Sequence, residues 1–118
     1  MLRKILRAKI HRATITEAQP DYVGSITIDR DLMDAVDLCA GECVLVADID
    51  TGARFQTYIF EGDRASGVMC VNGAAAKLVN VGDKIIIMAF GYVDSADATR
   101  HKAPVALVDD ANRLTGKI

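Results

Sequence analysis

Tryptophan is absent from this sequence of 118 residues, and aromatic side chains of all kinds make up only 5% of it. Proteins that bind single-stranded nucleic acid stack the bases on aromatic side chains, so a binding platform of that kind is not expected. The formal net charge of −2 gives no electrostatic attraction to the phosphates of nucleic acid or to an anionic membrane. We therefore expect neither nucleic acid nor a membrane among the partners.

Paired cysteines and long apolar runs are also missing. Cys39, Cys43 and Cys70 form no CxxC pair, and no histidine lies near them to complete a zinc site. The sequence thus predicts free, buried thiols, no metal site and a reducing, cytoplasmic setting. Basic residues interrupt the first twelve positions, unlike a signal peptide, and no run reaches the length of a membrane span.

The composition is typical of one soluble globular domain, with 51% hydrophobic and 25% charged residues. Short apolar and alternating runs indicate strands. We expect strands at residues 2–16, 23–29, 43–49, 53–60, 67–71, 84–90 and 105–108, loops at 17–21 and 61–66, and a hairpin turn at 50–52.

Two short helices are expected between these strands. The first is capped by Asp29 or Asp31 and closed by Gly41, and the second begins at Asn72 and ends near Leu78. Residues 93–118 form a weakly patterned tail, whose end we expect to be loose.

One pattern occurs twice, namely a short helix, a glycine followed by an acidic residue, and an apolar strand. Gly41-Glu42 precedes the first of these strands, and Gly82-Asp83 precedes the second. The repeat favours a barrel of short strands with internal twofold symmetry over a βαβ sheet, although two generic turns would give the same pattern.

A glycine stands directly before a serine in the strand-like stretch Tyr22-Val23-Gly24-Ser25-Ile26-Thr27-Ile28-Asp29. Glycine inside a strand usually marks a bulge or a close approach of two backbones. A chemical interpretation is also open, because the peptide at Gly24 can bend until the Ser25 hydroxyl faces the Gly24 carbonyl. An acyl shift from nitrogen to oxygen, followed by elimination, would then leave a pyruvoyl group at position 25.

The stretches around this dipeptide resemble the aspartate 1-decarboxylase family, whose members depend on a pyruvoyl group. The matching stretches are Lys9-Ile10-His11-Arg12-Ala13-Thr14, the stretch from Tyr22 to Asp29, Leu32-Met33-Asp34-Ala35, Asp50-Thr51-Gly52-Ala53-Arg54-Phe55, Thr57-Tyr58 and Val71-Asn72-Gly73-Ala74-Ala75-Ala76. Several separated motifs in the same order make the resemblance specific, and it extends from about residue 1 to 92.

This resemblance implies a mainly-β protein, a double-psi β-barrel with a few short helices. It also implies self-cleavage into residues 1–24 and 25–118, and a homotetramer with active sites between neighbouring subunits. The implied reaction converts L-aspartate into β-alanine and CO2 for pantothenate, and so coenzyme A, biosynthesis. The sequence leaves open whether a maturation factor assists the cleavage.

The resemblance also implies roles for single residues. Ser25 would become the pyruvoyl group, which forms a Schiff base with the substrate and serves as electron sink without a metal or pyridoxal phosphate. Tyr58 would donate the proton that replaces CO2, and Arg54 would bind the substrate carboxylate. Thr57 would hold the Gly24 carbonyl during cleavage and contact the substrate. The other implied site residues are Lys9, Gly73, Ala74 and Ala75 for substrate binding, and His11, Tyr22 and Asn72 for support.

Thr57 and Tyr58 pose a geometric problem, because adjacent strand residues point to opposite faces. Either a bulge lies between them or they serve sites on different sides of the strand.

Two other functions remain possible on the sequence. One is a non-catalytic β-barrel for binding or assembly, in which the Gly24-Ser25 pair is only a bulge. The other is a hydrolase that cleaves itself and uses Ser25 as an N-terminal nucleophile with a retained amine.

Overall fold

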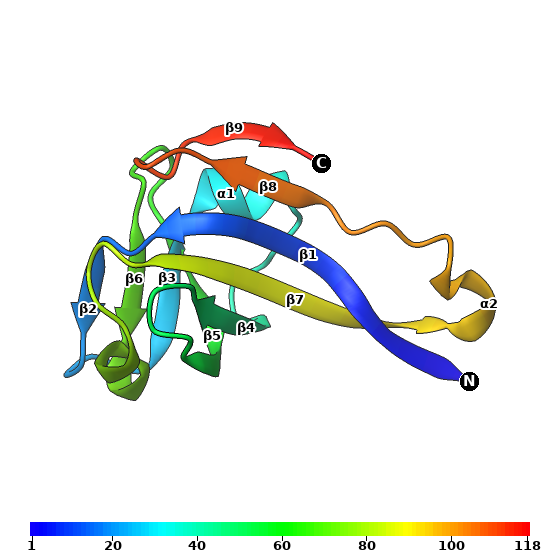
Figure 1. Cartoon of the computed structure of the whole chain (residues 1–118), viewed down its shortest axis with the longest axis horizontal. Coiled ribbons are helices and arrows are strands. Elements are labelled where there is room, and N and C mark those ends of the chain that lie inside the picture. Colours follow the sequence, from blue (N-terminus) through cyan, green and yellow to red (C-terminus); the bar gives the residue numbers. More distant parts are fainter.

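The computed structural model describes all 118 residues, and strands dominate it (Figure 1). The strands are β1 (Leu2–Thr14), β2 (Glu17–Gln19), β3 (Ser25–Asp29), β4 (Cys43–Asp48), β5 (Arg54–Gly62), β6 (Met69–Asn72), β7 (Lys84–Asp94), β8 (Val105–Val108) and β9 (Leu114–Lys117). The helices are short, namely α1 (Arg30–Ala35), the 3-10 helix η1 (Gly73–Leu78) and α2 (Ser95–Ala98). No helix is long and apolar enough to span a membrane.

The sheet closes on itself through the segment that contains β1 and β2. Its strands follow the hydrogen-bonded order β2-β6-β3-β5-β4-β7-β1-β8-β9. Only Ile15 and Thr16 separate β1 from β2, so one segment pairs with β7 on one side and with β6 on the other. The N–H of Ile15 donates to the carbonyl of Asp83, and that of Thr16 to the carbonyl of Met69. These strands therefore form a barrel.

The two halves of the barrel have the same strand pairing. β5 runs parallel to β3 and antiparallel to β4, just as the β1–β2 segment runs parallel to β6 and antiparallel to β7. Gly41 and Gly82 precede the corresponding strands β4 and β7, and both have positive φ, 84° and 95°. The predicted internal repeat is confirmed, and with it the mainly-β, double-psi barrel architecture.

Successive side chains along each strand point alternately into the barrel core and away from it. Ile26, Ile59 and Val71 occupy paired positions on β3, β5 and β6, and all three are fully buried in the core cluster. Because successive side chains in a strand point to opposite faces, Ser25 and Asn72, the neighbours of these residues, face the outside of the barrel.

Two strand boundaries near the Gly24-Ser25 dipeptide differ from the prediction. Residues 17–19 form β2 rather than a loop, because they pair in parallel with β6, a long-range interaction that alternation over three residues cannot reveal. Strand β3 begins at Ser25 rather than at residue 23, so the Gly24–Ser25 bond lies where a loop enters the sheet.

Two further expectations were wrong. Helix α1 is capped by Asp29, as one alternative predicted, but it ends at Ala35, and Gly41 instead supplies the left-handed turn before β4. The end of the chain is not loose, because β9 pairs with β8, which itself runs parallel to β1. The predicted strand at Val105–Val108 is confirmed.

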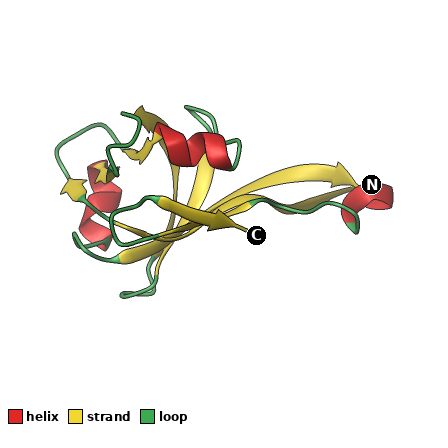
Figure 2. Cartoon of the chain, turned by 90° about the horizontal axis from the view of Figure 1, so that it is seen from above, coloured by secondary structure: helices red, strands yellow, loops and turns green.

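The paired strands β1 and β7 continue well beyond the barrel and end at the N-terminus and α2 (Figures 1 and 2). This arm makes the molecule elongated, with extents of 44 × 28 × 25 Å. Leu2, Phe90 and Tyr92 on the arm are exposed.

Candidate active site

Ser25 is the first residue of β3 and has no exposed surface. It pairs across the antiparallel ladder with Asn72, the last residue of β6. On the other side, Ile26 pairs with Ile59 in the parallel ladder between β3 and β5. Ser25 and Tyr58 each directly precede a member of this buried pair, so both side chains face the outside of the barrel at this end of the ladder.

The side chain of Asn72 holds the Ser25 hydroxyl. Its Nδ2 donates hydrogen bonds to Ser25 Oγ at 3.0 Å and to Thr27 Oγ1 at 3.3 Å. Asn72 stands at the N-cap position of η1 but makes no capping hydrogen bond, although asparagine is among the best capping residues. Its amide is thus directed to Ser25, and no side chain caps the N–H groups at the start of η1.

Cys70 orients this amide and was not predicted as a site residue. Its thiol donates to Asn72 Oδ1 at 3.2 Å, and both residues are buried. Burial raises the pKa of the Cys70 thiol, and the nearby Glu17 carboxylate raises it further, so the thiol keeps its proton and remains a donor. Cys70 lies two residues before Asn72 on the same strand face, a spacing that the sequence shows but that nothing marks as functional.

Gly73 packs directly against the dipeptide. Its φ is +75°, and a Cβ built on it would lie 2.6 Å from the Cα of Gly24, 2.9 Å from the Gly24 nitrogen and 3.3 Å from the Tyr22 carbonyl oxygen. Only glycine allows both this backbone conformation and this approach. Gly73 therefore fixes the backbone just before Ser25.

Thr57 and Tyr58 face opposite sides of β5. The ladder between β4 and β5 runs from Cys43–Tyr58 to Ala47–Arg54 without a register shift, so no bulge reverses either side chain. Thr57 lies two residues before Ile59, which pairs with Ile26 at the start of the parallel ladder between β5 and β3. Thr57 and Tyr58 therefore serve different sides of the strand, the second of the two alternatives that the sequence left open.

A cleft of about 580 Å³ adjoins this outer face. Its lining residues are Glu17, Asp21, Tyr22, Val23, Thr27, Phe60, Val68, Cys70 and Asn72. Tyr22 and Val23, beside the dipeptide, are 64% and 75% exposed. The ionisable groups at the cleft include the two carboxylates but no cationic side chain, so the lining of this cleft alone does not suit a dicarboxylate.

Arg54 is an unpaired cation on the same face of β5 as Tyr58. It is exposed at the start of the strand and takes part in none of the salt bridges of the chain. Its guanidinium is therefore available to a carboxylate from outside the chain.

Lys9 and His11 are not brought to Ser25. They lie on β1, eight to ten residues before Gln19, the residue of the β1–β2 segment that pairs with Asn72, and on the other way round the barrel β7, β4 and β5 lie between β1 and β3. Both are half-buried, and His11 Nδ1 is buried without a hydrogen-bond partner. Burial lowers the pKa of His11, and the charges of Lys9 and Arg12 lower it further, so the neutral imidazole is favoured.

The alanines that follow Gly73 lie in the first turn of η1. Ala74 is exposed and Ala75 is half-buried, and neither side chain is large enough to shield the backbone. The three cysteines are free, as predicted, but only Cys70 is buried, whereas Cys39 and Cys43 are exposed beside the turn at residues 39–42.

Comparison with known proteins adds an independent finding to this geometry. The family model described as aspartate decarboxylase matches residues 1–115. The chain belongs to the aspartate decarboxylase family. The resemblance seen in the sequence is thereby confirmed.

Individual members of the aspartate decarboxylase family cover nearly the whole chain. The aspartate 1-decarboxylase of Heliobacterium modesticaldum is 53% identical over 114 residues, which are 97% of this chain and 86% of that protein. The aspartate 1-decarboxylase of Bacillus cereus is 50% identical over 114 residues, 97% of this chain and 90% of that protein. Among solved structures, the rationally designed protein mkDPBB_sym_86 is similar over 67% of this chain and 91% of its own, with a TM-score of 0.47 and 16% identity.

Proposed function

We propose that this chain cleaves itself between Gly24 and Ser25 and then decarboxylates L-aspartate to β-alanine and CO2. In this role it is a carboxy-lyase that supplies β-alanine to pantothenate biosynthesis. The observation that carries the proposal is the buried Ser25 hydroxyl, which Asn72 Nδ2 holds at 3.0 Å in a member of the aspartate decarboxylase family. Neither a passive barrel nor an N-terminal nucleophile hydrolase is favoured by that membership.

Self-cleavage begins when the Ser25 oxygen loses its proton and adds to the Gly24 carbonyl carbon. The bond from that carbon to the Ser25 nitrogen then breaks, the nitrogen takes up a proton, and an ester remains. Loss of the Cα proton of residue 25 expels the Gly24 carboxylate, and water replaces the nitrogen, which leaves as ammonia. Thr57, on β5 next to the strand that Ser25 begins, donates to the carbonyl oxygen as negative charge develops on it.

The surroundings of residue 25 fit the pyruvoyl group that this sequence of steps produces. The Asn72 amide that donates to the Ser25 hydroxyl is equally a donor for a carbonyl oxygen. A pyruvoyl group at this position supplies the electron sink that decarboxylation of an amino acid requires.

The chain's own side chains bind the substrate and move its proton. Arg54 pairs with the carboxylate that aspartate retains, and a guanidinium binds a carboxylate through two parallel hydrogen bonds. The N–H groups of Gly73, Ala74 and Ala75 at the start of η1 supply further donors. Tyr58, on the same face as residue 25, gives its phenolic proton to the carbon that has lost CO2.

Lys9 and His11 enter the site from a neighbouring subunit of a homotetramer. Within one chain Lys9 and His11 lie eight to ten residues before Gln19, the nearest paired residue of their segment to Asn72, so a second copy is needed to complete the proposed site. Exposed aromatic side chains on β5 and on the β1–β7 arm offer apolar surface for this association; they are Tyr58, Phe60, Phe90 and Tyr92.

Ser25→Ala tests the proposed function directly, because it removes only the attacking oxygen. The variant is expected to fold, to remain a single chain of 118 residues and to release no CO2 from L-aspartate, while the natural chain gives fragments 1–24 and 25–118. Normal CO2 release by Ser25→Ala would contradict the proposal.

Mixing inactive chains tests the shared site. Chains with Ser25→Ala retain Lys9, and chains with Lys9→Ala retain a processed residue 25, so co-expressed mixtures are expected to regain decarboxylase activity. A mixture as inactive as either parent would contradict a site built from two subunits. Sedimentation of the natural protein, run in parallel, reports whether it is a tetramer.

A further inference from the structure

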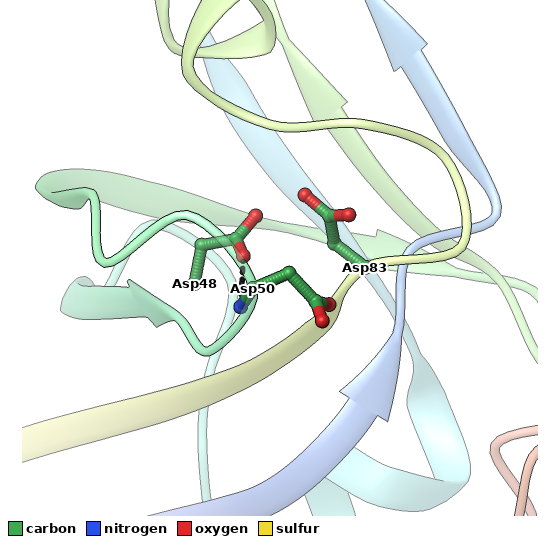
Figure 3. A group of neighbouring side chains, drawn as sticks. All are labelled: Asp48, Asp50 and Asp83. Carbon is green, nitrogen blue, oxygen red and sulfur yellow. Dashed lines mark hydrogen bonds between the residues drawn. The ribbon is translucent and has the colours of Figure 1, made fainter.

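Three aspartates gather on the side of the barrel where β4 ends and β7 begins. Asp48 is the last residue of β4, Asp50 lies in the turn that follows, and Asp83 immediately precedes β7. One oxygen from each carboxyl group lies within 4.8 Å of the other two. Figure 3 shows the carboxyl groups of Asp48 and Asp83 turned toward each other, whereas that of Asp50 lies below them and points away from the gap between them.

Backbone N–H groups hold each carboxylate by one oxygen and leave the other for a ligand. Asp48 Oδ1 accepts from the N–H of Asp50 at 2.8 Å. Asp50 Oδ2 accepts from the N–H of Lys84, and Asp83 Oδ2 from that of Asn80, each at 2.9 Å. The carboxylates are thus already oriented, as the ligands of a metal site usually are by the groups around them.

The remaining oxygen of Asp48 is the observation that points to a ligand. Asp48 is only 2% exposed, and its Oδ2 is buried without a hydrogen-bond partner. A buried, unpaired carboxylate oxygen is costly in free energy. The ammonium of Lys84, the residue after Asp83, binds Thr14 Oγ1 at 2.6 Å and the Asp110 carboxylate at 2.7 Å.

We propose that Asp48, Asp50 and Asp83 bind a divalent cation of the calcium type. An all-oxygen, all-carboxylate donor set is the one that hard divalent cations prefer. Calcium binds oxygens at about 2.3–2.6 Å, so ligand oxygens on opposite sides of the ion lie up to roughly 5 Å apart. The three oxygens lie within 4.8 Å of one another, which is inside that range.

Such an ion would join the turn after β4 to the start of β7. The same turn leads within a few residues to Arg54, the proposed carboxylate ligand at the start of β5. The cation would therefore stabilise the barrel and fix the turn from which Arg54 extends, without touching the substrate.

A proton shared by Asp48 and Asp83 is the competing occupant. Burial raises the pKa of Asp48, and the hydrogen bond that a protonated Asp48 would donate to the Asp83 carboxylate raises it further. A single shared proton would give Asp48 Oδ2 a hydrogen bond without involving the Asp50 carboxylate. A bound cation and a shared proton differ in one measurable property, because only a bound cation makes the stability of the protein depend on calcium.

Calorimetric titration with calcium chloride, after chelator treatment of the purified natural chain, tests the proposal. One ion is expected to bind per chain, and Asp48→Asn is expected to lower the affinity at least tenfold. Asp97→Asn is the matched control, because it removes the same charge from an exposed residue of α2, and it is expected to bind calcium as the natural chain does.

Thermal unfolding gives a second readout. At calcium concentrations of about one hundred times Kd, the melting temperature of the natural chain is expected to rise by several degrees, and that of Asp48→Asn to stay unchanged. Should Asp48→Asn not fold, Asp50→Asn in the exposed turn replaces it. Absence of calcium binding at millimolar concentration, or equal binding by the natural chain and the folded variant, would overturn the proposal in favour of the shared proton.

Discussion

Gly73→Ala is the most informative single change near the dipeptide, because the structure separates its two effects. The first is backbone strain, since φ at residue 73 is +75°, and a residue with a Cβ there costs about 1–2 kcal/mol. The second is overpacking, since the new Cβ would lie 2.6 Å from the Cα of Gly24, and such crowding typically costs about 1–3 kcal/mol. The sum predicts that the free energy of unfolding falls by roughly 2–5 kcal/mol.

Gly41→Ala isolates the first effect. Its φ is +84°, and a Cβ there meets no atom within 4 Å, so we expect only the strain of about 1–2 kcal/mol. Denaturant unfolding of both variants, built on the Ser25→Ala background so that every chain stays intact, measures the difference. That difference is the cost of pushing Gly73 against Gly24.

The same pair of variants on the natural background reports on self-cleavage. A displacement of about 1 Å between reacting groups can slow a reaction about a hundredfold, so Gly73→Ala is expected to slow the appearance of fragment 25–118 by about that factor. Gly41→Ala is expected to cleave at the natural rate. If the two variants cleaved and unfolded alike, the packing of Gly73 on Gly24 would have no part in positioning the bond.

Three further predictions concern other site residues. Arg54→Ala is expected to lower kcat/KM for L-aspartate by about 10- to 150-fold, the equivalent of about 1.5–3 kcal/mol for a lost charged hydrogen bond, while self-cleavage remains normal. Loss of self-cleavage would show that Arg54 acts in cleavage rather than in substrate binding. Cys70→Ala leaves the buried Asn72 Oδ1 without its donor and is expected to slow cleavage. Cys70→Ser keeps a donor and is expected to cleave at close to the natural rate. Equal cleavage rates for the two variants would refute the orienting role of Cys70. The pKa of His11 is lower in the folded chain than in the unfolded chain, so the unfolded chain takes up a proton at His11 first as pH falls below about 6.5, and the free energy of unfolding falls there. His11→Gln is expected to flatten this part of the curve of unfolding free energy against pH. An unchanged curve would assign the pH dependence to other groups.

Much of the barrel was predictable because alternation of apolar residues reports which face of a strand is buried. β4, β5, β7 and β8 appear close to where that pattern places them, and the repeated glycine and acidic residue mark the twofold relation. β2 and β9 escaped prediction because each consists of only a few residues and is held by pairing with a strand distant in sequence. The local sequence of a short strand does not show which distant strand it pairs with.

The candidate site residues were predicted one by one, and the sequence gives no information on how they are arranged. Ser25 and Asn72 were predicted separately, and only the register of β3 against β6 shows that their side chains meet. Cys70 was missed because its role depends on the amide of Asn72, which a sequence does not orient. The separation of Lys9 from Ser25 follows from the pairing of β2, not β1, with β6, which no residue pattern reveals.

Intact mass of the purified natural protein, combined with an assay of β-alanine from L-aspartate, tests the central claim most directly. The account predicts two fragments, residues 1–24 and 25–118, with the larger one lighter by one ammonia than a chain that begins with serine, and β-alanine formed with that preparation. An active preparation of unbroken chains would contradict it, as would a larger fragment that retains its amine.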